Sequence, residues 1–192
     1  MIDPAVEAAN ELLTRHGVRF AIVGGQAIAR DAATATRDVD VMVTTDEYRS
    51  AVERLREDKD LTLAWEGGPV TRFGIQTHRG VPLDVVDAGV FSGTKTSAEF
   101  FDFLIREHCT KADGVLYASP EMVWYTRLLT KRWRAYAEKI VTNVIDGISA
   151  DRLARVEEIA RKFGTDATLK ERIDYVREEL KRPDLETLLR RD

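Results

Sequence analysis

Two aspartates separated by one residue are the strongest chemical signal in this sequence. Asp38 and Asp40 flank Val39 in the segment RDVDVMV, whose apolar residues predict a buried strand over 38–43. Side chains alternate between the two faces of a strand, so residues two apart point the same way. Two carboxylates on one face supply the hard oxygen ligands that Mg²⁺ binds. The alternative is that one aspartate caps the strand and the other faces solvent.

Two glycines lie upstream of this acid pair. Gly24 and Gly25 follow an apolar segment, 18–23, that predicts a first strand, and they precede a predicted helix from Gln26 to about Ala33. Glycine lets a backbone approach a ligand closely, and the N–H groups at a helix start attract phosphate. The sequence therefore predicts a phosphate-binding turn beside a metal-binding acid pair. A tight turn with a purely structural role is the alternative for these glycines.

The segments GGQA and ATRDVDVMV resemble the first motif of the polymerase-β-like nucleotidyltransferase superfamily, and most closely its small members of the abortive-infection toxin type. The resemblance implies a nucleotidyltransferase-type mixed α/β sheet with flanking helices. It implies transfer of a nucleoside monophosphate from a nucleoside triphosphate to an acceptor, with release of pyrophosphate. It further implies two Mg²⁺ ions, with Mn²⁺ as a substitute, and an acceptor that is tRNA, a protein or a small molecule.

The same resemblance implies a third metal-binding carboxylate on a strand next to the acid pair. Asp84 in the segment VPLDVVDA has this position, and Asp87 is its competitor. Catalysis by two metal ions about 3.5–4 Å apart needs carboxylates that hold both ions, so that the attacking and leaving oxygens are stabilised. The alternative for Asp84 is a carboxylate on a solvated face of the sheet.

Two residues near the first motif are further candidates for substrate binding. Some family members have a serine where this chain has Gln26, so backbone N–H groups and Gln26 would have to bind the triphosphate here. Arg37 directly precedes the acid pair, and it would either bind phosphate or pair with a surface acid.

A basic helical segment follows the mixed part of the chain. The resemblance implies that Lys131 contacts the nucleotide phosphates, and Arg127 and Arg134 share its helix face by spacing. Lys139 and Asp146 resemble the fourth motif of the family, with Asp146 holding Lys139 or a substrate hydroxyl in place. The alternative is an ordinary solvated helix face. Four aromatic residues interleave with these bases: Trp124, Tyr125, Trp133 and Tyr136. They would stack on a nucleobase or, as we favour, pack in a helical core.

The elements that must position these residues form two parts. We expect a nucleotidyltransferase core over 1–118 and a C-terminal helical region over 119–192 that packs on it. Expected helices of the core begin at Asp3, Thr44 and Thr96 or Ser97, the last running through Cys109, where capping residues precede helical patterns. Further expected strands cover 61–65, 70–76 and 81–86, the last two as a hairpin.

Composition limits the class of protein. The chain has 192 residues, a net charge of −4 at pH 7 and one cysteine. This charge excludes an electrostatic surface for nucleic acid over the whole molecule, although a local basic patch is compatible with it. No apolar run approaches the roughly 20 residues that cross a bilayer, so we expect no membrane contact and a cytoplasmic protein.

Two alternatives to an enzyme remain open at this point. Some members of the superfamily bind nucleotides or partners without catalysis, and this chain could be such a module. The helical region could also bind a protein partner, either a neutralising antitoxin or a second copy in a homodimer.

Overall fold

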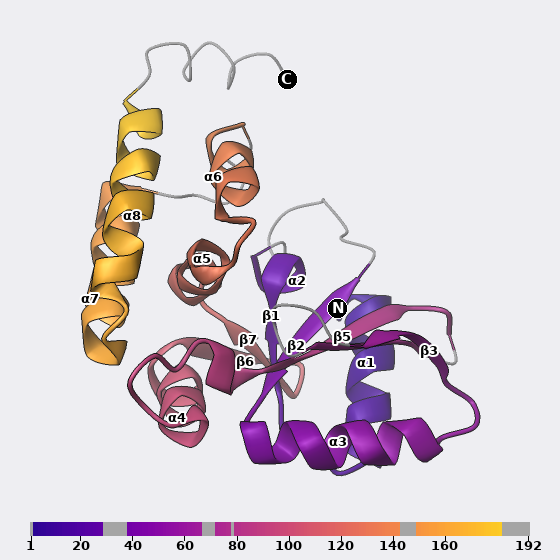
Figure 1. Ribbon diagram of the computed structural model, residues 1–192. Coiled ribbons are helices and arrows are strands. Elements are labelled where there is room, and N and C mark those ends of the chain that lie inside the picture. The colour runs from indigo at the N-terminus through magenta and orange to yellow at the C-terminus, as the bar shows by residue number, and fades with distance from the viewer. Residues whose placement is uncertain (1, 29–37, 67–71, 78, 143–148, 182–192) are drawn as a thin grey trace. The chain divides into compact units, whose positions relative to one another are not determined.

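The computed structural model (Figure 1) describes residues 2–28, 38–66, 72–77, 79–142 and 149–181. The chain divides into two compact units, Met1–Ser119 and Pro120–Asp192. Each unit buries apolar side chains of its own. Packing of the helical region on the core stays a prediction.

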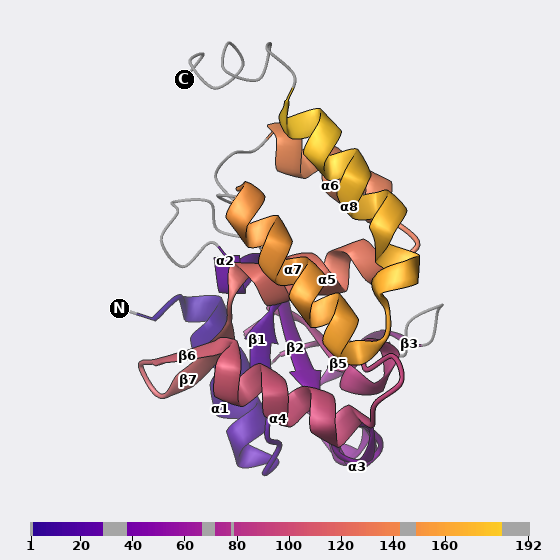
Figure 2. The ribbon, with the colours of Figure 1, turned by 90° about the vertical axis from the view of Figure 1, so that its left-hand side faces the viewer.

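The first unit contains a mixed sheet with helices on both faces. Its helices are α1 (Pro4–Arg15), α2 (Gly24–Ile28), α3 (Thr45–Glu57), η2 (Ala88–Val90) and α4 (Ser97–Glu107). Its strands are β1 (Ala21–Val23), β2 (Val39–Val43), β3 (Thr62–Glu66), β4 (Arg72–Gln76), β5 (Pro82–Asp87), β6 (Cys109–Ala112) and β7 (Val115–Ala118). Figures 1 and 2 show α3 and α4 on one face of the sheet and α2 on the other.

The described strands form one seven-stranded sheet in the order β3-β4-β5-β2-β1-β7-β6. β2 pairs with β5, and β1 with β7, in parallel, while the other neighbours are antiparallel. The parallel β2–β5 pair therefore lies inside the sheet, with a strand on either side of it. This arrangement confirms the predicted mixed α/β fold with flanking helices.

Capping residues set the starts of the helices as predicted. The Asp3 carboxylate accepts a hydrogen bond from the Ala5 N–H at 2.8 Å, and Thr44 Oγ1 accepts one from the Glu47 N–H at 3.2 Å. Thr96 forms a complete capping box at the start of α4. Each cap satisfies a backbone donor that has no partner inside its helix, so these helix starts were predictable from residue type.

Three predicted boundaries in the first unit are wrong for local reasons. β1 is shorter than expected because the Val18 N–H bonds to the Leu13 carbonyl oxygen at 2.9 Å and closes the end of α1 instead of joining the sheet. The helix after β1 begins at Gly24 and not at Gln26. Cys109 belongs to β6 and not to α4, because it pairs with Ala118 in a hairpin.

The second unit is helical, as expected, over its described residues. It contains α5 (Pro120–Leu129), α6 (Trp133–Thr142), α7 (Ala150–Phe163) and α8 (Asp166–Leu180). α5 packs against the other three helices, and α7 lies beside α8 (Figure 2). Gly164 ends α7 in the left-handed conformation. Within the described ranges, no helix is long and apolar enough to cross a membrane.

Candidate active site

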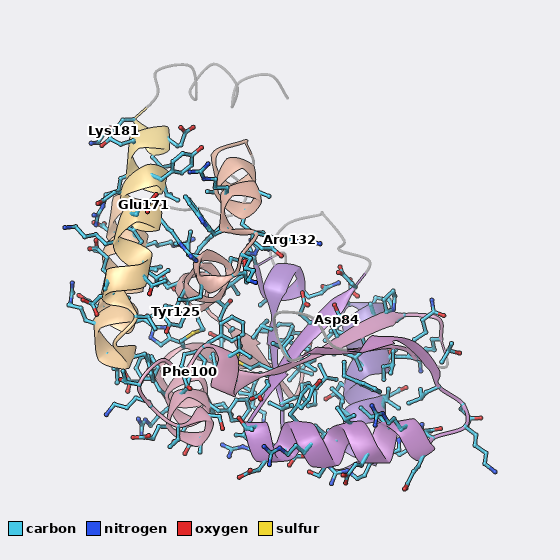
Figure 3. The ribbon with its side chains drawn as sticks, in the orientation of Figure 1. Asp84, Phe100, Tyr125, Arg132, Glu171 and Lys181 are labelled. Atoms are coloured by element: carbon cyan, nitrogen blue, oxygen red, sulfur yellow. The ribbon has the colours of Figure 1, made fainter. Side chains whose placement is uncertain are left out.

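The central parallel strands place Asp40 and Asp84 side by side. β2 and β5 pair in a register in which Asp40 lies directly opposite Asp84. Neighbouring strands are about 4.8 Å apart, and residues in register point to the same face. Two half-buried carboxylates from separate strands therefore stand next to each other. The stick view in Figure 3 shows Asp84 on the side of the sheet that carries α2.

Apolar residues support this acid pair from the opposite face of the sheet. Val39 and Val41 alternate with Asp40 along β2, and Leu83 and Val85 flank Asp84 along β5. All four apolar side chains are fully buried. The two strands are therefore fixed by the core, and the register cannot slip without moving these side chains to the wrong face.

Gly24 lies against the carboxylate of Asp40. A Cβ atom added to Gly24 would stand 2.1 Å from Asp40 Oδ2 and 2.9 Å from Asp40 Cγ. Gly24 also has φ +67°, a left-handed conformation that side chains disfavour. Glycine is therefore needed at the start of α2 for two reasons. The backbone there is left-handed, and the Asp40 carboxylate leaves no room for a side chain. Gly25 is the next residue of α2, and Gln26 is buried with 5% of its surface exposed.

Asp38 occupies a different position from the other two acids. It directly precedes β2 and is exposed. Among the described residues, no group of three or more His, Cys, Asp or Glu side chains could hold a metal ion. The structure therefore brings together two of the three predicted ligands. Mg²⁺ is commonly bound by one or two carboxylates together with substrate phosphates and water, so the Asp40–Asp84 pair fits such an ion.

The predicted substrate-binding residues outside this pair are distributed over the chain. Arg37 and Asp146 lie outside the described residues, as does the side chain of Lys139. Lys131 and Arg127 belong to the second unit. Lys131 is exposed in the turn between α5 and α6. The Arg127 guanidinium lies between two aromatic rings, 5.0 Å from that of Trp124 and 5.4 Å from that of Tyr136.

The aromatic residues of the basic segment divide into two groups. Trp124 and Tyr125 are fully buried, which confirms for them the interpretation as core residues. Burial also raises the pKa of the Tyr125 hydroxyl to about 12. Trp133 and Tyr136 are partly exposed and contact arginine side chains.

Gly74 is a candidate site residue that the motifs did not indicate. It lies opposite Asp84 on β4, so it belongs to the same row across the sheet as the acid pair. A glycine inside a strand is a sign of close approach by a ligand or another backbone. The only signal for it in the sequence is the glycine within the segment RFGIQ.

Cys109 lies on β6, an edge strand of the sheet, three strands from β2. Burial raises the pKa of its thiol to about 12, so the thiol stays protonated and unreactive near neutral pH.

The competitor of Asp84 has a structural role. Asp87 is buried, and its Oδ1 accepts hydrogen bonds of 2.7 Å from the Thr45 hydroxyl and the Gly89 N–H. It pairs in register with Val43, three residues along β2 from Asp40. Asp87 therefore joins the end of β5 to the start of α3, on the opposite face from Asp84.

This difference predicts opposite effects of two alanine substitutions. Asp87→Ala is expected to lower the free energy of unfolding by about 1–3 kcal/mol, because two partly buried donors lose their buried acceptor. Asp84→Ala is expected to change stability far less and to remove Mg²⁺ binding. Urea denaturation and magnesium titration of both variants check this. A stable Asp87→Ala protein that no longer binds Mg²⁺ would reverse the assignment.

No protein-family model and no curated protein matches the sequence. Three solved structures are similar to this chain at low sequence identity. The solution structure of the antibiotic-resistance factor ANT(2″)-Ia is 12% identical, with 92% of this chain and 89% of that chain covered and a TM-score of 0.46. The crystal structure of ANT(2″)-Ia with adenylyl-2″-tobramycin is 15% identical, with 92% and 94% covered and a TM-score of 0.44. A protein from H. pylori described as a nucleotidyltransferase is 12% identical, with 98% and 92% covered and a TM-score of 0.39.

Proposed function

We propose that this protein is a Mg²⁺-dependent nucleotidyltransferase. The observation that carries the proposal is the pairing of Asp40 with Asp84 on neighbouring strands, with Gly24 against the Asp40 carboxylate. Two neighbouring carboxylates supply the hard oxygen ligands that Mg²⁺ prefers. Mn²⁺ would be accepted by the same oxygen ligands.

In the proposed reaction an acceptor hydroxyl attacks the α-phosphorus of a nucleoside triphosphate. A new oxygen–phosphorus bond forms, the bond to the bridging oxygen breaks, pyrophosphate leaves, and the hydroxyl proton passes to solvent. Bound Mg²⁺ would neutralise negative charge on the phosphate oxygens. Asp40 and Asp84 would hold the metal, and the resemblance adds Asp38 as a third ligand of one or two ions.

The remaining candidate residues bind and orient the triphosphate. The backbone N–H groups of Gly24 and Gly25 face the phosphates, and Gln26 supports this turn from its buried position. The resemblance adds Lys131 and Arg127 as residues that would neutralise phosphate charge. The resemblance adds Arg37 as a phosphate ligand, and Lys139 and Asp146 as a pair that orients a substrate hydroxyl.

The acceptor and the cellular role follow from the resemblance alone. Among the possible acceptors, tRNA is the first to test, followed by proteins and small molecules. A toxin-like protein of the cytoplasm would be expected to have a neutralising partner, and a second copy of the chain is the other candidate partner.

The test is transfer of label from an α-³²P nucleoside triphosphate to an acceptor. The four nucleotides are incubated in turn with the protein, Mg²⁺ and total tRNA, protein or small-molecule acceptors. We expect label on one acceptor class and equimolar pyrophosphate, both lost on chelation of the metal. Binding of nucleotide without transfer to any acceptor would instead identify a non-catalytic module. Transfer that continues at the wild-type rate in Asp40→Ala would refute the site.

A further inference from the structure

An arginine from α8 holds the turn between α5 and α6. Arg172 Nη1 donates hydrogen bonds to the Leu128 carbonyl oxygen at 2.5 Å and to the Thr130 carbonyl oxygen at 3.3 Å. The last four carbonyl groups of a helix have no partner inside that helix. One guanidinium therefore satisfies the end of α5 and the first residue of the turn.

The same side chain also contacts the first residue of α6. The Arg172 guanidinium lies 5.6 Å from the centre of the Trp133 ring. Tyr175, one turn further along α8, meets that ring edge-on at 5.5 Å. Cation–π and edge-to-face contacts fix both the position and the orientation of an indole. α8 thus holds the chain on both sides of the turn.

Exposed cations without ion-pair partners among the described residues lie in this turn and at the start of α6. These are Lys131, Arg132 and Arg134, of which Figure 3 labels Arg132. Four other bases of the second unit have acidic partners. Arg152 and Arg155 lie 3.7 Å from Glu121, Arg177 lies 2.8 Å from Glu157, and Lys181 lies 2.7 Å from Glu178. The turn is therefore a local concentration of positive charge in a chain whose net charge is −4.

We propose that Arg172 is a positioning residue, which holds Lys131, Arg132 and Arg134 as a preformed site for a ligand with several phosphate groups. This proposal rests on the proposed function, in which Lys131 binds phosphate. Like charges held close together repel each other, and an anionic ligand removes that cost. Two sources share the required chemistry, the triphosphate of the nucleotide and the phosphodiester backbone of an RNA acceptor.

Arg172 does not contact the ligand. It acts on binding only by holding the turn in place. If the turn were flexible, binding would have to order the cations of the turn and of the start of α6. A turn that is already fixed in the unbound protein does not incur this entropic cost on binding. Lysine could not replace Arg172 fully, because one ammonium group lacks the planar fork that bonds carbonyl oxygens and stacks on an indole.

The test is calorimetric binding of tripolyphosphate at several salt concentrations, without Mg²⁺. The variants are Arg172→Met, Arg172→Lys, Lys131→Met and the double variant Arg172→Met/Lys131→Met. Arg177→Met is the matched control, because it removes an arginine of the same helix that pairs with Glu157 and Asp174. Thermal unfolding fixes a temperature at which every variant is folded.

We expect Arg172→Met and Lys131→Met each to weaken binding about tenfold. Each should also reduce by about one the number of counterions released on binding, which the salt dependence of the affinity measures. Arg172→Lys should give an intermediate loss, and Arg177→Met none. The double variant should bind no more weakly than Arg172→Met, since one residue acts through the other. Wild-type affinity in Arg172→Met, or additive losses in the double variant, would overturn the proposal.

Two further arms identify the ligand and separate this proposal from the transferase reaction. Labelled ATP and a single-stranded RNA oligonucleotide replace tripolyphosphate, and the ligand whose affinity falls in Arg172→Met is the one that the turn binds. If neither affinity falls, the proposal fails. Binding in these assays needs no turnover, so a protein that shows the Arg172 effect but transfers no label keeps this site and loses only the proposed function.

Discussion

Asp40→Asn is expected to abolish nucleotidyl transfer, by about a thousandfold or more, while leaving the fold intact. Asparagine has the same size as aspartate but carries no charge, so it cannot neutralise a divalent ion. Asp40 is half-buried within β2, where both neighbouring valines are fully buried, and the substitution leaves this packing unchanged. The loss of function should therefore come without a loss of folded protein.

Metal-dependent stability gives a readout of Asp40 that does not depend on finding the acceptor. A ligand that binds only the folded state stabilises it, by about 2.7 kcal/mol at a hundred times its Kd. Adding Mg²⁺ should therefore raise the unfolding temperature of the wild type, and EDTA should reverse the rise. Asp40→Asn should show no such rise. Asp46→Asn is the control, since it removes an exposed carboxylate from α3 and leaves the acid pair in place.

An equal effect of Mg²⁺ on the wild type and on Asp40→Asn would contradict this prediction. The ion would then bind elsewhere, and the pairing of Asp40 with Asp84 would be a feature of the sheet alone. A loss of secondary structure in Asp40→Asn, measured by circular dichroism, would instead give the carboxylate a structural role.

The parts of the fold that local chemistry controls were predictable from the sequence. Asp3, Thr44 and Thr96 cap helices because each supplies an oxygen to a backbone donor within three residues. The acid-x-acid pattern placed Asp40 within a strand, and the apolar alternation placed the valines in the core. Such features depend on neighbours in sequence, so residue type and spacing are sufficient to infer them.

Features that depend on distant segments were not predictable from local patterns, and the expectation that Asp84 lies beside the acid pair came from the resemblance alone. Asp40 lies opposite Asp84 because β2 and β5 pair in a particular register. The two residues are more than 40 positions apart in sequence, so no local pattern determines that register. The choice between Asp84 and Asp87 required the contact of Asp87 with Thr45. Arg172 has no motif around it, and only the packing of α8 on the turn after α5 reveals its contacts.

Gly24→Ala should remove most of the activity at a modest cost in stability. The new methyl group would stand 2.1 Å from Asp40 Oδ2 and 3.0 Å from Asp40 Cβ, so the Asp40 side chain must turn away. Displacing a catalytic group by about 1 Å can cost about a hundredfold in rate. We therefore expect a loss of at least about a hundredfold in label transfer, together with weaker binding of Mg²⁺.

Gly17→Ala separates the backbone effect from the contact with the carboxylate. Gly17 has φ +65°, close to the +67° of Gly24, but no atom lies within 4 Å of a Cβ added there. Alanine in this conformation costs about 1–2 kcal/mol at either position. Both variants should therefore unfold at lower urea concentration, and only Gly24→Ala should lose the rise in unfolding temperature caused by Mg²⁺.

The comparison between the two glycines decides what Gly24 does. If Gly24→Ala binds Mg²⁺ and transfers label as well as Gly17→Ala does, Gly24 serves only the turn, and the carboxylate tolerates displacement. If Gly24→Ala alone loses both, the opening residue of α2 sets the position of the Asp40 carboxylate. The glycine motif would then contribute to metal binding through Asp40, in addition to any contact of its backbone with phosphate.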